Sequence, residues 1–465
     1  MKREKIFPIV NRFRSSGWGR GENSWDSGDE LVSRAHSHGT VTWCARVLES
    51  VSSDAPDQSV RRLSRRRALA LGVGGVGIGL AGCLGDSGDD EGSAPAQSRE
   101  NRQIAGAPPT NVDLPVSDEK LTRGAPRDAI RAIDDPVFGS DWAGVSAEVP
   151  VAITSIGRPR KQTIEPRLAD DDTVIGVSRA GEARAYPLRV LNWHEVVNDS
   201  FGGPLLVSYC PLCRTAITAE RRAGGRVTRF GVTGLLFRDD LVMYDEATDS
   251  RWSQLLATAI QGKLTGEQLE LVPSTLTTLG AWRKSHPDTA VLRPPPESGM
   301  LGEGGQPRDY TINPYTWYQT SKVTGVGGQF DGSDASQTDG ESLHPKAVVL
   351  GVAHDGQARA YPAEAVREVG IVEARVGGLP IVVTTAPGGT PVAWSREVEG
   401  SVLSFAVAGE RHLSAGGSRW RRATGDAVDG PYEGKHLTQA NAVSPLFWFA
   451  WLEFYPETEL YGSGE

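Results

Sequence analysis

Residues 173–187 read TVIGVSRAGEARAYP, and residues 348–362 read VVLGVAHDGQARAYP. Nine of these fifteen positions are identical without a gap, which indicates an internal repeat. Each copy has two apolar runs separated by a turn at Gly181 or Gly356, a pattern typical of paired strands. The repeat therefore predicts a β-rich chain built from two related modules that arose by internal duplication.

Shorter matches continue the repeat. Gly202-Gly203 corresponds to Gly377-Gly378, and Ser250-Arg251-Trp252 corresponds to Ser418-Arg419-Trp420. We therefore expect a first module at 126–293 and a second at 342–465. Between them, residues 294–341 are rich in Pro and Gly and are predicted to be a loop-rich connection.

Within the modules, strand patterns outnumber helix patterns, so the predicted fold class is α+β with mixed or antiparallel sheets. A buried strand, with apolar residues at successive positions, is expected at 204–209. The other elements predicted for the first module are a helix at 188–198, a hairpin pairing 215–221 with 226–232, a second hairpin pairing 240–244 with 250–254, and a helix that Ser274 caps and that ends at Lys284.

The region before the modules has the pattern of an exported protein. Residues 61–82 combine paired arginines with a short, Gly-rich apolar run, which predicts a twin-arginine-type signal peptide too short to span a membrane. Leu80-Ala81-Gly82-Cys83 resembles a lipobox, so we expect a lipid on Cys83; an uncleaved N-terminal anchor is the alternative. Residues 1–60 are predicted to be a non-native or disordered leader, and residues 83–125 a disordered tether.

This organisation predicts a location outside the cytoplasm, on the outer face of the cytoplasmic membrane, with the lipid as the membrane contact. The leader carries 13 basic and 8 acidic residues, so the rest of a chain of net charge −9 has a net charge of −14. Because nucleic acid binding depends on basic surface, this acidity argues against a nucleic acid partner.

Two cysteines, Cys210 and Cys213, form the one C-x-x-C motif of the chain. Such a pair can form a reversible disulfide, hold a low-pKa thiolate, or supply half of a soft-metal site. A structural disulfide is a weak explanation, because closing a two-residue loop removes little entropy from the unfolded chain. The second module has residues 384–388 (TTAPG) in the corresponding place, so the scaffold does not require the sulfurs.

His194 is a further candidate, because the second module has Val369 at the corresponding position and so lacks the histidine as well as the cysteines. It would serve as a base for a thiol or as a third metal ligand; a satisfied core histidine is the alternative. Arg214 adjoins Cys213 and is expected to lower a thiol pKa.

The stretch after residue 231 adds polar and aromatic candidates. Asp239 and Asp240 could bind a cation, although Asp is also ordinary in turns. Met243 could ligate Cu(I) as a thioether, although a strand Met is more often core filling. Tyr244 and Asp245 complete the set of candidates.

Several motifs together resemble the family named domain of unknown function 3179, over about residues 128–460. They are WHEVVND (193–199), YCPLCRTA (209–216), GVTGLLFRDDLVMYD (231–245) and WSQ (252–254), with DAIRAIDD (128–135) before them and RDYTINPY (308–315) after. The resemblance implies an exported or lipid-anchored protein of bacteria or archaea, and it implies no particular reaction. The chain departs from the family pattern at Arg214, where a small residue is common.

Three hypotheses follow. In the first, the protein has a thiol-based redox or nucleophilic site, with Cys210 attacking, Cys213 resolving, and His194 and Arg214 assisting. In the second, Cys210, Cys213 and His194, with Met243 as an additional ligand, bind copper or another soft metal such as zinc for delivery. In the third, the protein is a surface binding module with a structural disulfide. The first two imply a redox or metal-exchange protein partner.

Overall fold

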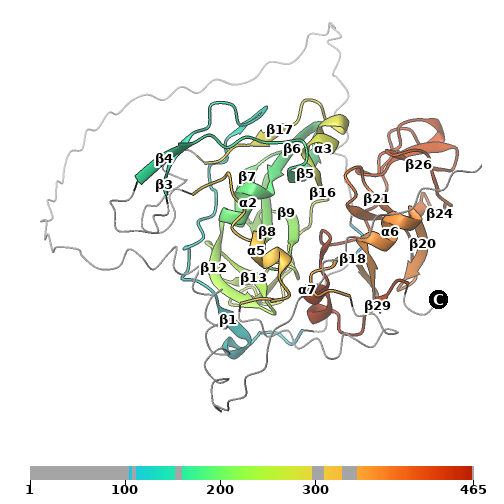
Figure 1. Ribbon diagram of the computed structural model, residues 1–465. Coiled ribbons are helices and arrows are strands. Elements are labelled where there is room, and N and C mark those ends of the chain that lie inside the picture. Colours follow the sequence, from blue (N-terminus) through green and yellow to red (C-terminus); the bar gives the residue numbers. More distant parts are fainter. Residues whose placement is uncertain (1–103, 107–111, 152–159, 296–307, 327–342, 463–465) are drawn as a thin grey trace, which may run out of the picture. The chain divides into compact units, whose positions relative to one another are not determined.

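A computed structural model describes residues 104–106, 112–151, 160–295, 308–326 and 343–462 (Figure 1). The predicted leader, the signal peptide, Cys83 and most of the tether lie outside these ranges. Within them, no helix is both long and apolar enough to cross a membrane.

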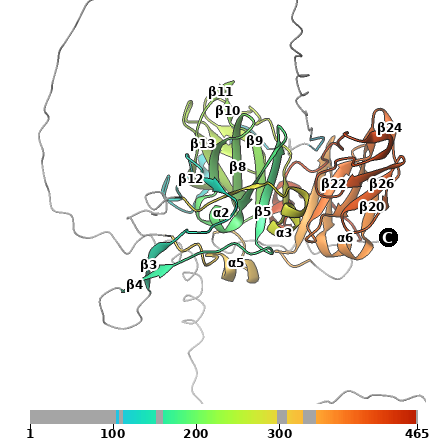
Figure 2. The same cartoon turned by 90° about the horizontal axis from the view of Figure 1, so that it is seen from above.

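The predicted β-rich architecture with mixed and antiparallel sheets is confirmed (Figures 1 and 2). The elements of residues 112–326 are, in chain order, η1 (Asp118–Lys120), β1 (Leu121–Arg123), β2 (Phe138–Gly139), β3 (Ala147–Val151), β4 (Arg160–Ile164), β5 (Thr173–Arg179), β6 (Glu182–Pro187), α2 (Leu188–His194), β7 (Val196–Ser200), β8 (Pro204–Cys210), β9 (Thr215–Glu220), β10 (Arg222–Ala223), β11 (Arg226–Val227), β12 (Phe230–Phe237), β13 (Asp240–Asp245), β14 (Arg251–Ser253), β15 (Thr258–Gln261), β16 (Thr275–Thr278), α3 (Leu279–Ser285), β17 (Ala290–Leu292) and α5 (Thr316–Thr320).

The second module contains the same kinds of element. They are β18 (Val348–His354), β19 (Gln357–Pro362), α6 (Ala363–Val369), β20 (Ile371–Val376), β21 (Leu379–Thr385), β22 (Pro391–Ser395), β23 (Glu397–Val398), β24 (Ser401–Val402), β25 (Ala406–Val407), β26 (His412–Ala415), β27 (Ser418–Arg421), η3 (Gly430–Tyr432), β28 (Leu446–Phe447), α7 (Trp448–Phe454) and β29 (Glu459–Leu460).

One sheet in each module is built in the same way. The strand orders are β16-β5-β6-β17-β2 and β28-β18-β19-β29. In both, the first three strands are antiparallel, and the strand after α3 or α7 pairs parallel to the third. Both modules also contain a three-stranded antiparallel sheet, β7-β8-β9 or β20-β21-β22. The common origin of the two modules remains a prediction, but their elements follow the order that it requires.

A tryptophan on the helix packs against a glycine of the sheet in each module. A Cβ on Gly176 would lie 2.4 Å from the ring of Trp282, and a Cβ on Gly351 would lie 2.2 Å from the ring of Trp451. Real Cβ atoms do not approach a ring so closely, so only glycine allows this packing. The indole nitrogens donate to Thr289 and Thr458 respectively, each over 2.9 Å.

Three predicted details of the first module are wrong. Helix α2 ends at His194 rather than at residue 198, because Glu195 adopts a left-handed conformation (φ 59°) and the β-branched pair Val196-Val197 joins a sheet. Helix α3 is capped by Thr278, whose hydroxyl accepts a hydrogen bond from the Ala281 N–H, and not by Ser274.

The third wrong detail is the hairpin expected between residues 215–221 and 226–232. Only β10 and β11 pair there, over two residues each. Strand β9 instead pairs with β8, and β12 joins the separate sheet β1-β12-β13-β14-β15. The sequence signal at Ala223-Gly224-Gly225 thus correctly indicated a turn. It did not indicate that the longer strands on either side, β9 and β12, pair with other strands.

Candidate functional site

Both cysteines lie where strand β8 passes into strand β9. Cys210 is the last residue of β8 and pairs with Thr215, the first residue of β9. Cys213 lies in the four-residue turn between the two strands. Both are free thiols and are buried, with 2 % and 0 % of their surface exposed.

The two sulfur atoms lie within 4.8 Å of each other. In addition, the Cys213 Sγ donates to the main-chain oxygen of Asp239, over 3.2 Å. Burial raises the pKa of Cys213 well above the ordinary thiol value, and the hydrogen bond with Cys210 raises it further. Cys213 is therefore a thiol rather than a thiolate in the resting site.

Asp240 completes a group of three ligating side chains. One ligand atom each from Cys210, Cys213 and Asp240 lies within 4.8 Å of the other two, and all three residues are buried. Among the described residues, no cation forms an ion pair with Asp240. The group thus brings together three side chains that can each carry negative charge, without a counter-charge beside the carboxylate.

The Asp240 carboxylate is held by donors on one oxygen. Its Oδ2 accepts from the Leu255 N–H over 2.8 Å and from the Ser253 hydroxyl over 3.3 Å. Its Oδ1 has a longer, 3.4 Å contact with the hydroxyl of Thr215, which makes a shorter bond of 2.7 Å to Gln254. Because a hydroxyl has one hydrogen, Oδ1 retains capacity for a further ligand. Burial raises the pKa of Asp240 to about 7.

The backbone around the group is strained. Arg238 and Asp239 form the two-residue turn between β12 and β13, with φ of 50° and 59°, and Arg214 in the cysteine turn has φ 60°. Tight hairpin turns of this conformation normally use Asn or Gly, because other side chains disfavour the left-handed region. Strain of this kind is concentrated at functional sites, and here it aims the Asp239 carbonyl at Cys213.

A segment of the second module lies against the cysteine turn. The Phe447 N–H donates to the main-chain oxygen of Cys213 over 3.0 Å, and the Ser444 N–H donates to that of Ala216 over 3.1 Å. Helix α5 holds the turn at another point, because the Tyr318 hydroxyl donates to the Leu212 oxygen over 3.0 Å. The tyrosine ring in turn lies under the Lys346 ammonium, 3.2 Å from the ring centre.

Arg214 has a different environment from the one expected. Its Nη1 donates to the main-chain oxygen of Pro445 over 2.9 Å, and burial lowers the pKa of its guanidinium. The pKa of the adjacent Cys213 is raised, opposite to the direction expected beside an arginine. Arg214 therefore connects the cysteine turn to the second module.

His194 is not part of the group of three. Its Nε2 lies 2.6 Å from the Tyr310 hydroxyl and its Nδ1 lies 2.7 Å from the Arg131 main-chain oxygen, so both ring nitrogens already have partners. Burial, with a smaller contribution from Arg308, lowers its pKa to about 3. These contacts are those of a neutral, satisfied core histidine, and they give no support to its predicted roles as base or ligand.

The remaining candidates, Met243, Tyr244 and Asp245, lie further along β13. Side chains alternate along a strand, so Met243 and Asp245 project from the face opposite Asp240. The Asp245 carboxylate accepts from the Thr248 N–H and from the Trp252 indole, which fixes the turn before β14. Tyr244 donates to Asp128 over 2.9 Å.

Sequence reasoning missed the buried polar residues that surround the group. The WSQ stretch was noted only as a motif, yet Ser253 and Gln254 hold Asp240 and Thr215 in place. Glu195 falls within the stretch expected to be helical, 188–198, and is not among the candidates from the sequence. Its left-handed conformation instead leaves it 6 % exposed, and burial raises its pKa to about 8, with Arg308 opposing and Asp240 reinforcing the shift.

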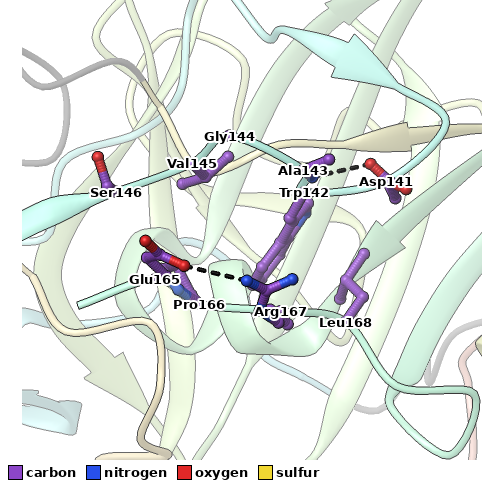
Figure 3. Close-up of a pocket in the computed structure, with 10 residues that line it drawn as sticks. All are labelled: Asp141, Trp142, Ala143, Gly144, Val145, Ser146, Glu165, Pro166, Arg167 and Leu168. Atoms are coloured by element: carbon purple, nitrogen blue, oxygen red, sulfur yellow. Dashed lines mark hydrogen bonds and ion pairs between the residues drawn. The ribbon is translucent and has the colours of Figure 1, made fainter.

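A separate hollow lies beside the β3–β4 hairpin, as Figure 3 shows. It has a volume of about 290 Å³ and is lined by residues 141–146 and 165–168. The Trp142 indole N–H donates a hydrogen bond to the main-chain oxygen of Leu292, and Arg167 forms an ion pair with Glu165. The hollow shares no residue with the cysteine group and brings together no reactive side chains.

The chain belongs to the family described as Protein of unknown function (DUF3179), whose model matches residues 127–458. No match was found among curated proteins or among solved structures.

Proposed function

We propose that this DUF3179 protein binds a thiophilic divalent cation, of which Zn²⁺ is the best fit, through Cys210, Cys213 and Asp240. The observation that carries the proposal is the convergence of three ligand atoms within 4.8 Å, where no cation of the described ranges pairs with the buried carboxylate. Buried groups that can carry charge are costly unless a counter-charge accompanies them. A metal ion supplies that charge and allows both thiols and the carboxyl to lose their protons.

The distances and the donor types both fit zinc. Ligand atoms in tetrahedral zinc sites lie about 3.5 to 3.8 Å apart, given Zn–S and Zn–O bonds of about 2.3 and 2.0 Å. The group is therefore close to a ligating geometry, and a small inward movement completes it. Two sulfurs and one carboxylate oxygen suit Zn²⁺, whereas Cu(I) prefers ligand sets made of sulfur alone. Three protein ligands would leave a fourth position for water or for a partner's ligand.

The test is metal binding by the full chain purified under reducing conditions and stripped with a chelator. We expect one Zn²⁺ per chain, measured by elemental analysis and by competition with a chromophoric chelator. The total free energy of zinc binding at a protein site is roughly 10 kcal/mol or more, and each ligand contributes a part of it. Changing Cys213→Ser or Asp240→Asn should therefore weaken binding by about 100-fold or more. Met243→Leu is the matched control and should bind normally, since this buried sulfur lies on the other face of β13.

Two results would contradict the proposal. One is a reduced wild-type protein that takes up no Zn²⁺. The other is binding that is equal in Cys213→Ser and in the wild type, which would place the ion elsewhere.

A second candidate function rests on the contact between the two thiols. Because both cysteines are free and their sulfur atoms lie within 4.8 Å, a small movement would allow them to form one S–S bond. Both thiols would lose a proton, and two electrons would pass to a disulfide of a partner protein, which would be reduced to two thiols. The raised pKa of Cys213 makes this reaction slow from the resting site. Thiol titration in defined thiol–disulfide buffers tests it, and the metal hypothesis is favoured if the pair stays reduced throughout.

The proposed location follows from residues 61–83 and is the outer face of the cytoplasmic membrane, with a lipid on Cys83. Its support is the basic, Gly-rich signal pattern and the lipobox-like LAGC. Fractionation of cells with mass analysis of the mature N-terminus tests it. We expect the protein in the membrane fraction, beginning at a lipid-modified Cys83, and soluble protein that begins elsewhere would contradict this.

A further inference from the structure

An open cavity lies at the position of the second module that corresponds to the cysteine site of the first, and residues of both modules line it. The correspondence follows from backbone pairing. In the first module, Trp252 pairs with Met243, and the Gln254 N–H donates to the Leu241 oxygen over 3.0 Å. In the second, Trp420 pairs with Leu413, and the Arg422 N–H donates to the Arg411 oxygen over 2.9 Å.

By this register, Arg422 stands where the first module has Gln254, and Glu410 stands where it has Asp240. Cys210 and Thr385 are the last residues of the corresponding strands β8 and β21. The place of the C-x-x-C turn is therefore taken by residues 385–388, which carry no thiol.

These counterparts line one open cavity of about 930 Å³. Residues 385–388 form part of its wall, and its charged lining residues are Asp170, Asp171, Lys284, Glu410, Arg411 and Arg422. Five of these six are solvent-exposed, so water and salt screen their charges. Arg422 is the exception, with 7 % of its surface exposed.

The Arg422 guanidinium is poorly satisfied by the protein. Its Nε lies 3.4 Å from the His412 oxygen and its Nη1 lies 3.4 Å from the Thr385 oxygen, which are long contacts to main-chain carbonyls. Among the residues that the structure describes, no carboxylate forms an ion pair with it. An arginine has five N–H donors, so most of its hydrogen-bonding capacity remains unused. Burial also lowers its pKa, as expected for a cation without a counter-charge.

We propose that this cavity binds a small organic anion whose carboxylate or phosphate group pairs with Arg422. A buried guanidinium matches two oxygens of such a group with two parallel hydrogen bonds, which are stronger at a buried site than in water. Lys284 and Arg411 at the exposed margin add attraction for the anion. The cavity would then be a second ligand site, at the position that corresponds to the proposed metal site of the first module.

The test uses the full chain, with succinate and inorganic phosphate as probes in separate calorimetric titrations. We expect at least one probe to bind the wild type and to raise its melting temperature. Arg422→Met should weaken that binding by about 10-fold or more, since a charge-assisted bidentate contact is lost. Arg422→Lys keeps the positive charge but cannot make two parallel hydrogen bonds, so it should bind the anion with intermediate affinity. The comparison of the two probes shows whether carboxylate or phosphate is preferred.

Stability separates a ligand-binding role from a structural one. Without ligand, Arg422→Met should melt at the same temperature as the wild type or higher, because it removes an uncompensated buried charge. Arg421→Met is the matched control: Arg421 is exposed, lies 3.7 Å from Asp426 and does not line the cavity, so anion binding should persist. Cys213→Ser should also bind the anion normally, which keeps this test independent of the metal site.

The proposal is overturned if neither probe binds the wild type, or if Arg422→Met binds the probe as well as the wild type does. It is likewise overturned if Arg422→Met lowers the melting temperature in the absence of anion, because Arg422 would then be a structural residue.

Discussion

At the scale of single residues, Glu195 determines a pH dependence that can be measured. Burial raises its pKa from 4.5 to about 8, with Arg308 opposing and Asp240 reinforcing the shift. The folded chain therefore holds a proton between pH 4.5 and 8 that the unfolded chain has lost. Because stability falls with rising pH wherever the folded state binds more protons, Glu195 should make the metal-free protein less stable at pH 8 than at pH 6.5. Below pH 6.5 the buried, neutral His194 opposes this effect.

Replacing Glu195 by Gln should reduce this loss, by an amount on the order of a few kcal/mol, because the amide stays neutral throughout. Denaturant unfolding of chelator-treated protein at several pH values measures it. The stability of the variant should still fall somewhat with rising pH, since burial also raises the pKa values of Asp240 and Glu453, each to about 7. The control is Glu182→Gln at the exposed first position of β6, which should leave the pH dependence of stability unchanged. A Glu195→Gln protein with the slope of the wild type would show that Glu195 is ionised in the folded state.

The residues of the site could be predicted only in part. The rarity of cysteine identified Cys210 and Cys213, and Asp240 was among the residues considered for a cation. Their convergence, however, depends on the packing of two separate sheets, β1-β12-β13-β14-β15 and β7-β8-β9, which brings the start of β13 close to the end of β8. His194 was selected because it was lost together with the cysteines in the second module. That pattern fits equally well a core residue whose partners, Tyr310 and Arg131, also lie in the first part of the chain.

At the scale of elements, the cysteine turn depends on helix α5. The Tyr318 hydroxyl donates to the Leu212 oxygen and accepts from the Gly325 N–H, each over 3.0 Å. Tyr318→Phe removes the anchor while keeping the ring, so the turn should lose its fixed position. We expect the Zn²⁺ affinity to fall about 10-fold, the usual size of an effect that acts through a ligand's surroundings.

The matched control is Trp317→Phe on the same helix, because Trp317 is 56 % exposed. Chelator competition on both variants, with circular dichroism to verify folding, measures the difference. Equal affinities in Tyr318→Phe and the wild type would show that the strand ends alone hold the turn.

Elements with strong patterns were predicted well, and those fixed by distant partners were not. Strands β5, β6 and β8 follow from their apolar patterns and from the Gly181 turn. Strand β9 could not be paired correctly, because its partner β8 precedes it across the cysteine turn while the stronger turn signal follows it. The end of α2 was missed for a related reason, since Val196 and Val197 are tolerated in a helix until a neighbouring strand competes for them.

At the scale of the whole molecule, one hydrophobic core contains residues of both modules. Cys210, Cys213 and Trp252 belong to the same cluster of buried residues as Phe447 and Trp451. No periodicity within either module indicates this, because the pattern of a segment shows that a face is buried but not what covers it. The sequence patterns did not indicate that residues 444–447 contact the cysteine turn.

This shared core predicts that the described part of the chain unfolds as one unit. A module that loses its partner exposes the apolar surface of the common cluster, so neither is expected to remain folded alone. Scanning calorimetry of metal-free protein should show one transition, with calorimetric and van't Hoff enthalpies that agree. Zn²⁺ at about 100 times its dissociation constant should move that whole transition upward, by roughly 2.7 kcal/mol in stability. In Cys213→Ser the shift should vanish while the transition stays single. Two resolved transitions, only one of which responds to Zn²⁺, would mean that the contacts from Ser444 and Phe447 to the cysteine turn do not couple the modules.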